Sequence, residues 1–454
     1  MSEKAIIRDL TTGKIAPILL RLAFPVMLSN LLQTVYNMVD MVIVGQIEGS
    51  AGLAAVSVGA DLIHLFTFIG MGFATAGQIM VSQYLGAGKR EDLNGVIGTL
   101  FSFNFLSAAF FSVLVLFAAP GMLHLLHVKP AFFQAALDYT RCCGAGFVFL
   151  FGYQMLSAIL RGMGDSKHPM YFIAIASVLN IVLDLLFIRV FGMGAFGAAL
   201  ATVIAQGVSV LLCLGYLFLH RVHFSFDFRP ASFRILKDPF LIMLKLGIPI
   251  AIQTSAGNIS NLFVSSLINP LGVVYTAVTG VGNKLNSIAL IVANALNTSG
   301  SSVIGQSYGA RKTKRVKGVF WHVFAFDLAF VSTLSILMLV FPEHIFSLFN
   351  KDPAALALAP VYAPVAAISF MGFAFRSPSL SFINGLGQSR INFLMGIVEG
   401  YILRIGLVWF LGNVLGLGIY GYWYGAVIAS YGYGLVVFPY FFSDRWITHF
   451  EPVV

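Results

Sequence analysis

Apolar residues occur along this chain in long runs that are separated by short polar stretches. A membrane-spanning helix needs about 20 mostly apolar residues. Runs of this kind recur twelve times, near residues 16–44, 52–82, 95–119, 132–158, 169–190, 194–219, 240–268, 273–304, 318–341, 355–383, 391–413 and 417–441. The pattern predicts an all-α integral membrane protein with twelve transmembrane helices, of which the longer ones tilt or bend.

The most polar stretch between spans divides them into two sets of six. This stretch, His220–Pro239, reads HRVHFSFDFRPASFRILKDP. We therefore predict an N-terminal lobe of residues 1–227 and a C-terminal lobe of residues 228–454, with a linker at about 220–239.

The two sets of spans repeat each other in sequence. QYLGAGK at 83–89 is matched by QSYGARK at 306–312, and GMGDSK at 162–167 is matched by GLGQSR at 385–390, both at an offset of 223 residues. Pro25 and Pro249 begin equivalent spans, and Gly194 and Gly418 begin another equivalent pair. A constant offset indicates a tandem duplication. Parallel repeats of this kind are typical of transporters with a central cavity between two pseudo-symmetric halves.

Composition and charge narrow the class of protein further. Of the 454 residues, 58% are hydrophobic and only 10% are charged, which disfavours a soluble enzyme or a nucleic-acid binder despite the net charge of +9. Twenty lysines and arginines, including Lys4, fall in loops expected on one side, whereas Lys129, Arg189 and Lys351 fall on the other. This bias predicts that both termini are cytoplasmic.

Charged side chains inside spans are costly and usually functional. Asp40 lies within the first span and shares a helical face with Gln33 and Asn37. Asn180 and Asp184 share a face of the fifth span, and the run around them, VLNIVLDLLF at 178–187, contains no basic residue.

Thr202, on the sixth span, adds a hydroxyl to this set. If these helices converge, they form a cluster of oxygen ligands suited to sodium, and two nearby carboxylates also favour binding of a proton. The alternative is a polar clamp between helices that holds no ion.

The second half carries different chemistry. Glu399 and Arg404 lie on the eleventh span, and Arg376 on the tenth is within reach of either. These three residues form a possible ion pair, which is either structural or part of a coupling or substrate site. The roles of Asp61 and Asp327, inside the second and ninth spans, stay open.

The chain resembles the multidrug and toxic compound extrusion (MATE) family over essentially its whole length. The resemblance depends on DMVIVG at 40–45, on LRGMGDS at 160–166, and on the paired motifs at 83–89 and 306–312. It implies two six-helix lobes arranged in a V around a central cavity. It also implies export of amphiphilic, often cationic, organic compounds driven by entry of protons or sodium.

Within that family the chain is most similar to the DinF-like branch. This similarity implies that Asp40, Asn180, Asp184 and Thr202 couple transport to the cation, which is a proton or sodium. The NorM-like branch has a glutamate in the seventh span, which this chain lacks, so a coupling site in the C-terminal lobe is not expected.

We therefore expect a monomeric antiporter in the cell membrane that is not an enzyme and has no cofactor beyond its coupling ion. Its partners are small amphiphilic substrates and the lipid bilayer, not nucleic acid. Neutral and aromatic residues on the first and seventh spans are the candidates for the substrate cavity, namely Gln33, Tyr36, Asn37 and Asn258.

Three alternatives remain. A flippase for lipid-linked precursors belongs to the same superfamily, but such proteins often have more spans and an arginine-rich cavity. An intramembrane enzyme needs a nucleophile with a base or a metal cluster, and the sequence offers neither pattern. A passive channel does not require the carboxylate and amide cluster.

Overall fold

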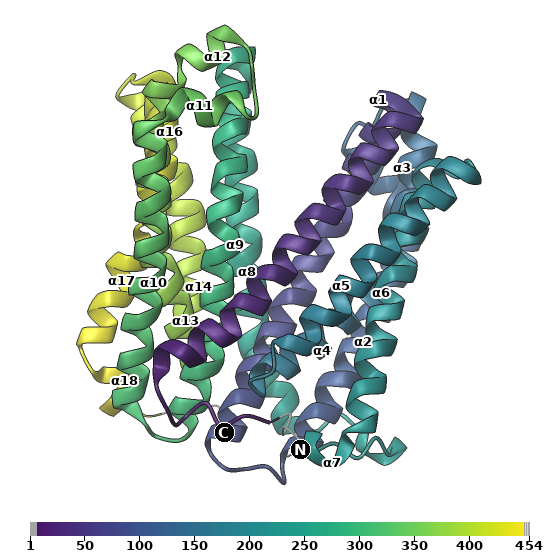
Figure 1. Cartoon of the computed structure of the whole chain (residues 1–454), viewed down its shortest axis with the longest axis vertical. Coiled ribbons are helices and arrows are strands. Elements are labelled where there is room, and N and C mark those ends of the chain that lie inside the picture. The colour runs from purple at the N-terminus through teal and green to yellow at the C-terminus, as the bar shows by residue number, and fades with distance from the viewer. Residues whose placement is uncertain (1–6, 449, 451, 453–454) are drawn as a thin grey trace. The chain divides into compact units, whose positions relative to one another are not determined.

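The structure, a computed structural model, describes residues 7–448, 450 and 452. Lys4 and both chain ends, on which the predicted orientation partly depends, lie outside the described residues. Within the described part the chain is helical and has no strand (Figure 1).

The helices divide between α-helices and short helices of other types, here labelled η. They are α1 (Ile15–Gly86), α2 (Leu93–Leu125), α3 (Pro130–Ala145), α4 (Phe147–Gly162), α5 (Lys167–Asp184), η1 (Leu185–Val190), α6 (Gly194–Leu219), α7 (Arg221–Phe224), η2 (Pro230–Ser232), α8 (Lys237–Ile268), η3 (Asn269–Leu271), α9 (Val273–Gly309), α10 (Thr313–Val340), α11 (Pro342–Ser347), α12 (Pro353–Ala357), α13 (Ala359–Leu386), α14 (Ser389–Met395), η4 (Gly396–Ile405), α15 (Gly406–Trp409), η5 (Phe410–Val414), α16 (Gly418–Ala429), α17 (Gly432–Phe442) and α18 (Arg445–Thr448).

Twelve spans are present in the described part of the chain, as the hydropathy pattern predicted. Ten helices are long and apolar enough to cross a membrane. The longest of them, α1, is two spans joined at Gly49, whose φ of 68° and ψ of −161° interrupt the helical backbone. A further span is bent by 48° between α3 and α4.

The chain forms two compact units. One comprises Phe24–Ala251 with the described residues up to Asp9, and the other comprises Leu10–Ala23 with the residues from Ile252 onward. The boundaries therefore fall inside α1 and α8, close to Pro25 and Pro249, and not within the polar stretch 220–239.

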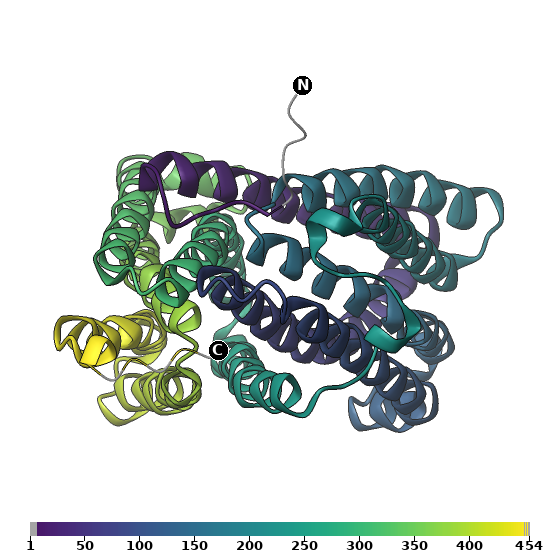
Figure 2. The ribbon, with the colours of Figure 1, turned by 90° about the horizontal axis from the view of Figure 1, so that it is seen from below.

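Each unit has its own apolar core. The core of the first unit gathers fully buried side chains such as Val115, Phe147 and Phe151. The core of the second includes Phe346 and Trp423. Figures 1 and 2 both place α17 and α18, in yellow, at one edge of the second unit. Within each unit, α-helices satisfy the backbone internally, as hydrocarbon requires.

The backbone conformation follows the repeat seen in the sequence. Residues in the left-handed region recur in the two halves at an offset of 223 or 224. The pairs are Gly49 and Gly272, Gly88 and Arg311, Gly164 and Gly387, Gly192 and Gly416, and Gly194 and Gly418. Such conformations favour glycine, which explains why these loop positions are conspicuous in the sequence.

One close approach between helices is repeated as well. A Cβ placed on Gly162 of α4 would lie 2.8 Å from the carbonyl oxygen of Gln78 and 3.2 Å from Cβ of Val81. Gly385 of α13 meets Ser301 and Ile304, the residues at an offset of 223 from Gln78 and Val81. Small residues at these crossings allow the backbones to approach closely.

We predict that Gly162→Ala and Gly385→Ala each destabilise the protein, because the added methyl group overpacks a helix crossing at a cost of about 1–3 kcal/mol. Both variants should lose monodispersity in detergent at a lower temperature than the wild type. Gly215→Ala in α6 is the matched control, because no atom lies within 4 Å of the added Cβ. The temperature at which this variant loses monodispersity should not be lower than that of the wild type. Equal midpoints in all three variants would contradict the proposed crossings.

Candidate functional site

The residues predicted for the first unit converge on α1, α5 and α6. Asp184 is 0% exposed, Asn180 is 1% exposed and Asp40 is 7% exposed. The side-chain amide of Asn180 donates to Thr202 Oγ1 at 3.5 Å. The carboxylates of Asp40 and Asp184 lie close enough to interact electrostatically.

Helical spacing explains this placement. Asn180 and Asp184 are one turn apart on α5 and therefore lie on the same face of the helix. The π-helix η1 starts directly after Asp184, at Leu185. Single π-helical turns inside membrane or soluble helices occur often at functional sites, because they rotate the following residues out of the regular helical register.

Four oxygens of this cluster are buried and accept no hydrogen bond from the described residues. They are one carboxylate oxygen of Asp40, the side-chain oxygen of Asn180 and both carboxylate oxygens of Asp184. Buried acceptors without a donor are costly. The donor set, two carboxylates with an amide oxygen and a hydroxyl, matches the oxygen ligands that hard cations prefer, and a carboxylate oxygen also takes a proton. These residues therefore fit a sodium ion or a proton.

The residues predicted for the substrate cavity differ in how far they are buried. Tyr36 is half-buried beside Asp40 and Asp184, and its hydroxyl accepts from Gln206 Nε2 at 3.5 Å. Gln33 is half-buried, and Asn37 is exposed. On α8 in the second unit, Asn258 is exposed, and its amide donates to the carbonyl oxygen of Thr254 at 3.0 Å.

Sequence reasoning missed Gln206. Tyr36, Asn180, Thr202 and Gln206 line one narrow pocket, together with two alanines of α5 and α6. Gln206 lies one helical turn after Thr202, so the same spacing argument that grouped Asn180 with Asp184 was a usable signal for this residue.

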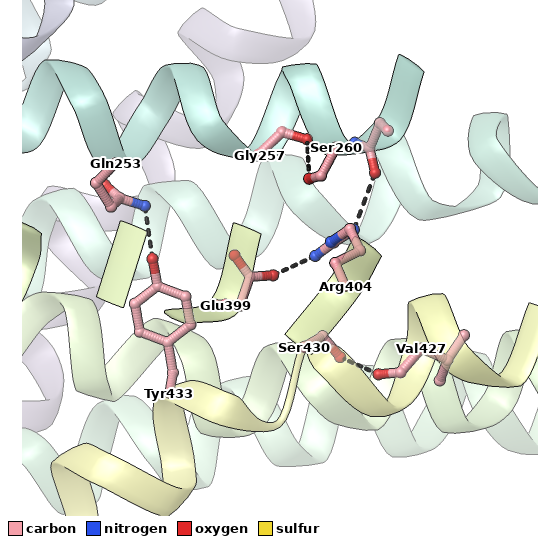
Figure 3. Close-up of polar contacts among 9 residues, drawn as sticks. Gln253, Gly257, Ser260, Glu399, Arg404, Val427, Ser430 and Tyr433 are labelled. Atoms are coloured by element: carbon pink, nitrogen blue, oxygen red, sulfur yellow. Dashed lines mark hydrogen bonds and ion pairs between the residues drawn. The ribbon is translucent and has the colours of Figure 1, made fainter. Parts of the chain in front are cut away.

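The second unit holds a separate polar cluster, on α8, α13, η4 and α17. Figure 3 shows its members on α8, η4 and α17. Glu399 forms an ion pair with Arg404, whose Nη1 also donates to Asn261 Oδ1 at 2.9 Å. Arg376 does not join this ion pair and lies over the ring of Tyr433, 5.3 Å from its centroid. Gln253 Nε2 donates to the hydroxyl of Tyr433 at 2.7 Å.

Asp327 on α10 stands apart from both clusters. Its side chain is 0% exposed, and neither carboxylate oxygen accepts a hydrogen bond that meets ordinary geometry in the described part of the chain. The neighbouring hydroxyl of Ser377 instead donates to the carbonyl oxygen of Ala293 at 3.0 Å. The residue at an offset of 223 is Asn104, also buried, so a neutral polar side chain occupies the same position in the first half.

Known multidrug resistance proteins resemble this chain in sequence and in fold. YpnP of Bacillus subtilis, a probable multidrug resistance protein, is 28% identical over 90% of this chain and 93% of its own. The multidrug resistance protein MdtK of Yersinia pseudotuberculosis is 24% identical, over 90% of this chain and 91% of its own. The outward-facing structure of a multidrug resistance MATE family transporter is 21% identical and superposes with a TM-score of 0.90 over 99% of both chains.

The model of the MatE family matches residues 25–186 and, separately, residues 248–410. The two matched segments lie in different halves of the repeat and together cover more than half of the chain. The chain belongs to the MatE family, and it is therefore a multi-pass membrane transporter and not an enzyme.

Proposed function

We propose that this transporter exports amphiphilic organic compounds, chiefly cations, from the cell in exchange for protons or sodium. The proposal includes a place in the cell membrane, cytoplasmic termini and a monomeric state. The names of the relatives support a multidrug substrate range. The positive loop bias supports the orientation.

The observation that carries the proposal is the group of unpartnered buried oxygens on Asp40, Asn180 and Asp184. Inside a membrane, two carboxylates without a basic partner are stable only if a proton or a cation neutralises them. Thr202 adds a hydroxyl oxygen at the edge of the same group. In this proposal these four residues form the coupling site, as they do in the DinF-like branch that the sequence resembles.

Exchange requires that the incoming cation disfavours the bound drug. A cation or proton on Asp40 or Asp184 removes the negative charge that attracts a cationic drug, so the two ligands compete for one electrostatic site. The titratable side chains that interact with Asp40 from α1 and α3 are Tyr36, Tyr139 and Cys143. They are uncharged residue types at neutral pH, so the competition depends on the carboxylates.

We predict that Asp40→Asn and Asp184→Asn each reduce gradient-driven efflux by at least about tenfold while expression stays near the wild-type level. Dye efflux from proteoliposomes, under proton and sodium gradients imposed separately, measures the loss and identifies the ion. The matched control is Asp138→Asn, because Asp138 on α3 already accepts a hydrogen bond from Gln134 at 2.8 Å. Wild-type transport in both cluster variants would refute the coupling site.

We also predict that the affinity for a cationic dye falls as the pH is lowered and the cluster takes up protons. The affinity falls because protonation removes the negative charge that attracts the cationic dye. Equilibrium binding of a labelled dye across a pH series measures the effect, which should disappear in Asp184→Asn. An affinity independent of pH, with transport still driven by a proton gradient, would mean that drug and proton bind to separate sites.

Asn258→Ala should weaken transport only about two- to threefold. The exposed side-chain amide donates its hydrogen bond to a carbonyl oxygen of its own helix, and the substitution removes no carboxylate. The initial rate of efflux under the same gradients is the measurement. Complete loss of coupling in this variant would move the ion site to the second unit.

A further inference from the structure

The polar cluster of the second unit carries an excess of positive charge. Its charged groups are two guanidinium groups, on Arg376 and Arg404, and one carboxylate, that of Glu399, which pairs with Arg404 and interacts electrostatically with Arg376. Among the described residues, Arg404 is the one ion-pair partner of Glu399, and Arg376 forms no ion pair. The cluster therefore has a net charge of about +1 if each group has its ordinary ionisation state.

This charge lies deep within the spans. Glu399 and Arg404 are each about ten or more residues from both ends of the span 389–414, and Arg376 is about ten residues from the end of α13. Ten helical residues correspond to roughly 15 Å, half of a hydrocarbon core of about 30 Å. An arginine at this depth reaches neither headgroup region along its own side chain, so its charge needs a counter-anion or water.

One donor of the cluster, on Arg404, remains unpaired within the described part of the chain. Arg404 uses Nη2 for Glu399 and Nη1 for Asn261, but its Nε is buried and has no acceptor among the described residues. Arg376 is half-buried, and its guanidinium contacts Tyr433, a neutral ring held by Gln253. A guanidinium with open N–H groups is the preferred partner of a carboxylate.

A purely structural ion pair has a different signature. Such a pair balances its charges and satisfies its buried donors, since an unpaired buried charge costs more than the pair gains. Here one arginine would have been sufficient to neutralise Glu399. The second guanidinium has no such explanation, and at an offset of 223 the first half carries Tyr153, Ala176 and Ile181 in place of Arg376, Glu399 and Arg404.

We propose that Arg376 and Arg404 form an anion subsite, with Glu399 holding Arg404 in position, and that this subsite binds the carboxylate of a zwitterionic amphiphile. The inference rests on the proposed export function and narrows its substrate class to compounds that carry an amine and a carboxylate. A chloride ion offers the same single negative charge, so it is the other source of the anion.

The test compares two ligands that differ only in the anionic group, a fluorescent amphiphile with an amine and a carboxylate and its methyl ester. Binding to the purified full chain is measured at equilibrium. The wild type should bind the zwitterion about tenfold more tightly than the ester, as expected for a charge-assisted hydrogen bond. Arg404→Gln, which brings the cluster to zero charge, should abolish this preference.

The double variant Glu399→Gln/Arg404→Gln separates charge from folding. It removes the ion pair but keeps the +1 charge on Arg376, so most of the preference should return. The double variant also tests the inference if Arg404→Gln alone fails to fold. Arg141→Gln is the matched control, because Arg141 lies in a span of the first unit and its Nε donates to the carbonyl oxygen of Leu116; it should keep the full preference.

Repeating the titrations with methanesulfonate in place of chloride distinguishes the two anions. If the subsite holds chloride, the ester should bind more weakly without chloride, and the zwitterion should compete with chloride. Equal binding of both ligands to the wild type with no chloride effect would overturn the anion subsite, as would a preference that persists in Arg404→Gln. If the ester is still exported under a cation gradient, only this inference fails; if neither ligand is exported, the proposed function fails as well.

Discussion

The absence of water inside a bilayer is the constraint on which the rest of this structure depends. Every backbone N–H and C=O group in the spans must bond within its own helix, so the described chain is helical and interrupts its helices mainly at glycines such as Gly49. Polar side chains in the spans also lack water, but the regular helix does not supply their hydrogen bonds as it does for the backbone. Each one that stays in the interior must find a partner there, and those that do not are the residues where an ion or a substrate is needed.

The two halves meet this constraint in opposite ways. In the first unit, Asp40 and Asp184 are buried without a basic partner, whereas in the second, Glu399 is paired with Arg404 and Arg376 lies nearby. At an offset of 223, Asp40 and Asp184 correspond to Phe263 and Leu407. Duplication therefore preserved the helix crossings at Gly162 and Gly385, while the charged chemistry diverged between the halves.

There is a physical reason why the helix crossings stayed the same in the two halves while the charged residues diverged. A glycine at a close helix crossing is constrained by the backbone of its neighbour, and any side chain there costs packing energy. A carboxylate in a span is constrained only by what neutralises it, so it is free to appear in one half and be absent from the other. Asn104 and Asp327 illustrate an intermediate case, since both are buried polar residues of similar shape at equivalent positions.

The sequence by itself determined the helical class, the twelve spans and the repeat, because hydropathy and turn glycines act locally and recur at a constant offset. It also singled out Asp40, Asn180, Asp184 and Thr202, since a carboxylate in an apolar run is conspicuous without any structure. The unit boundaries inside α1 and α8 were not visible, because both helices continue through them without a polar break.

Only the tertiary structure decided which side chains meet. Gln206 reaches Tyr36 across 170 residues of sequence, and Arg404, not Arg376, pairs with Glu399. These choices depend on how each helix is rotated about its axis and how it crosses its neighbours, and packing across the whole unit sets both. Spacing within one helix places residues on a common face, but it carries no information about which face of another helix lies opposite.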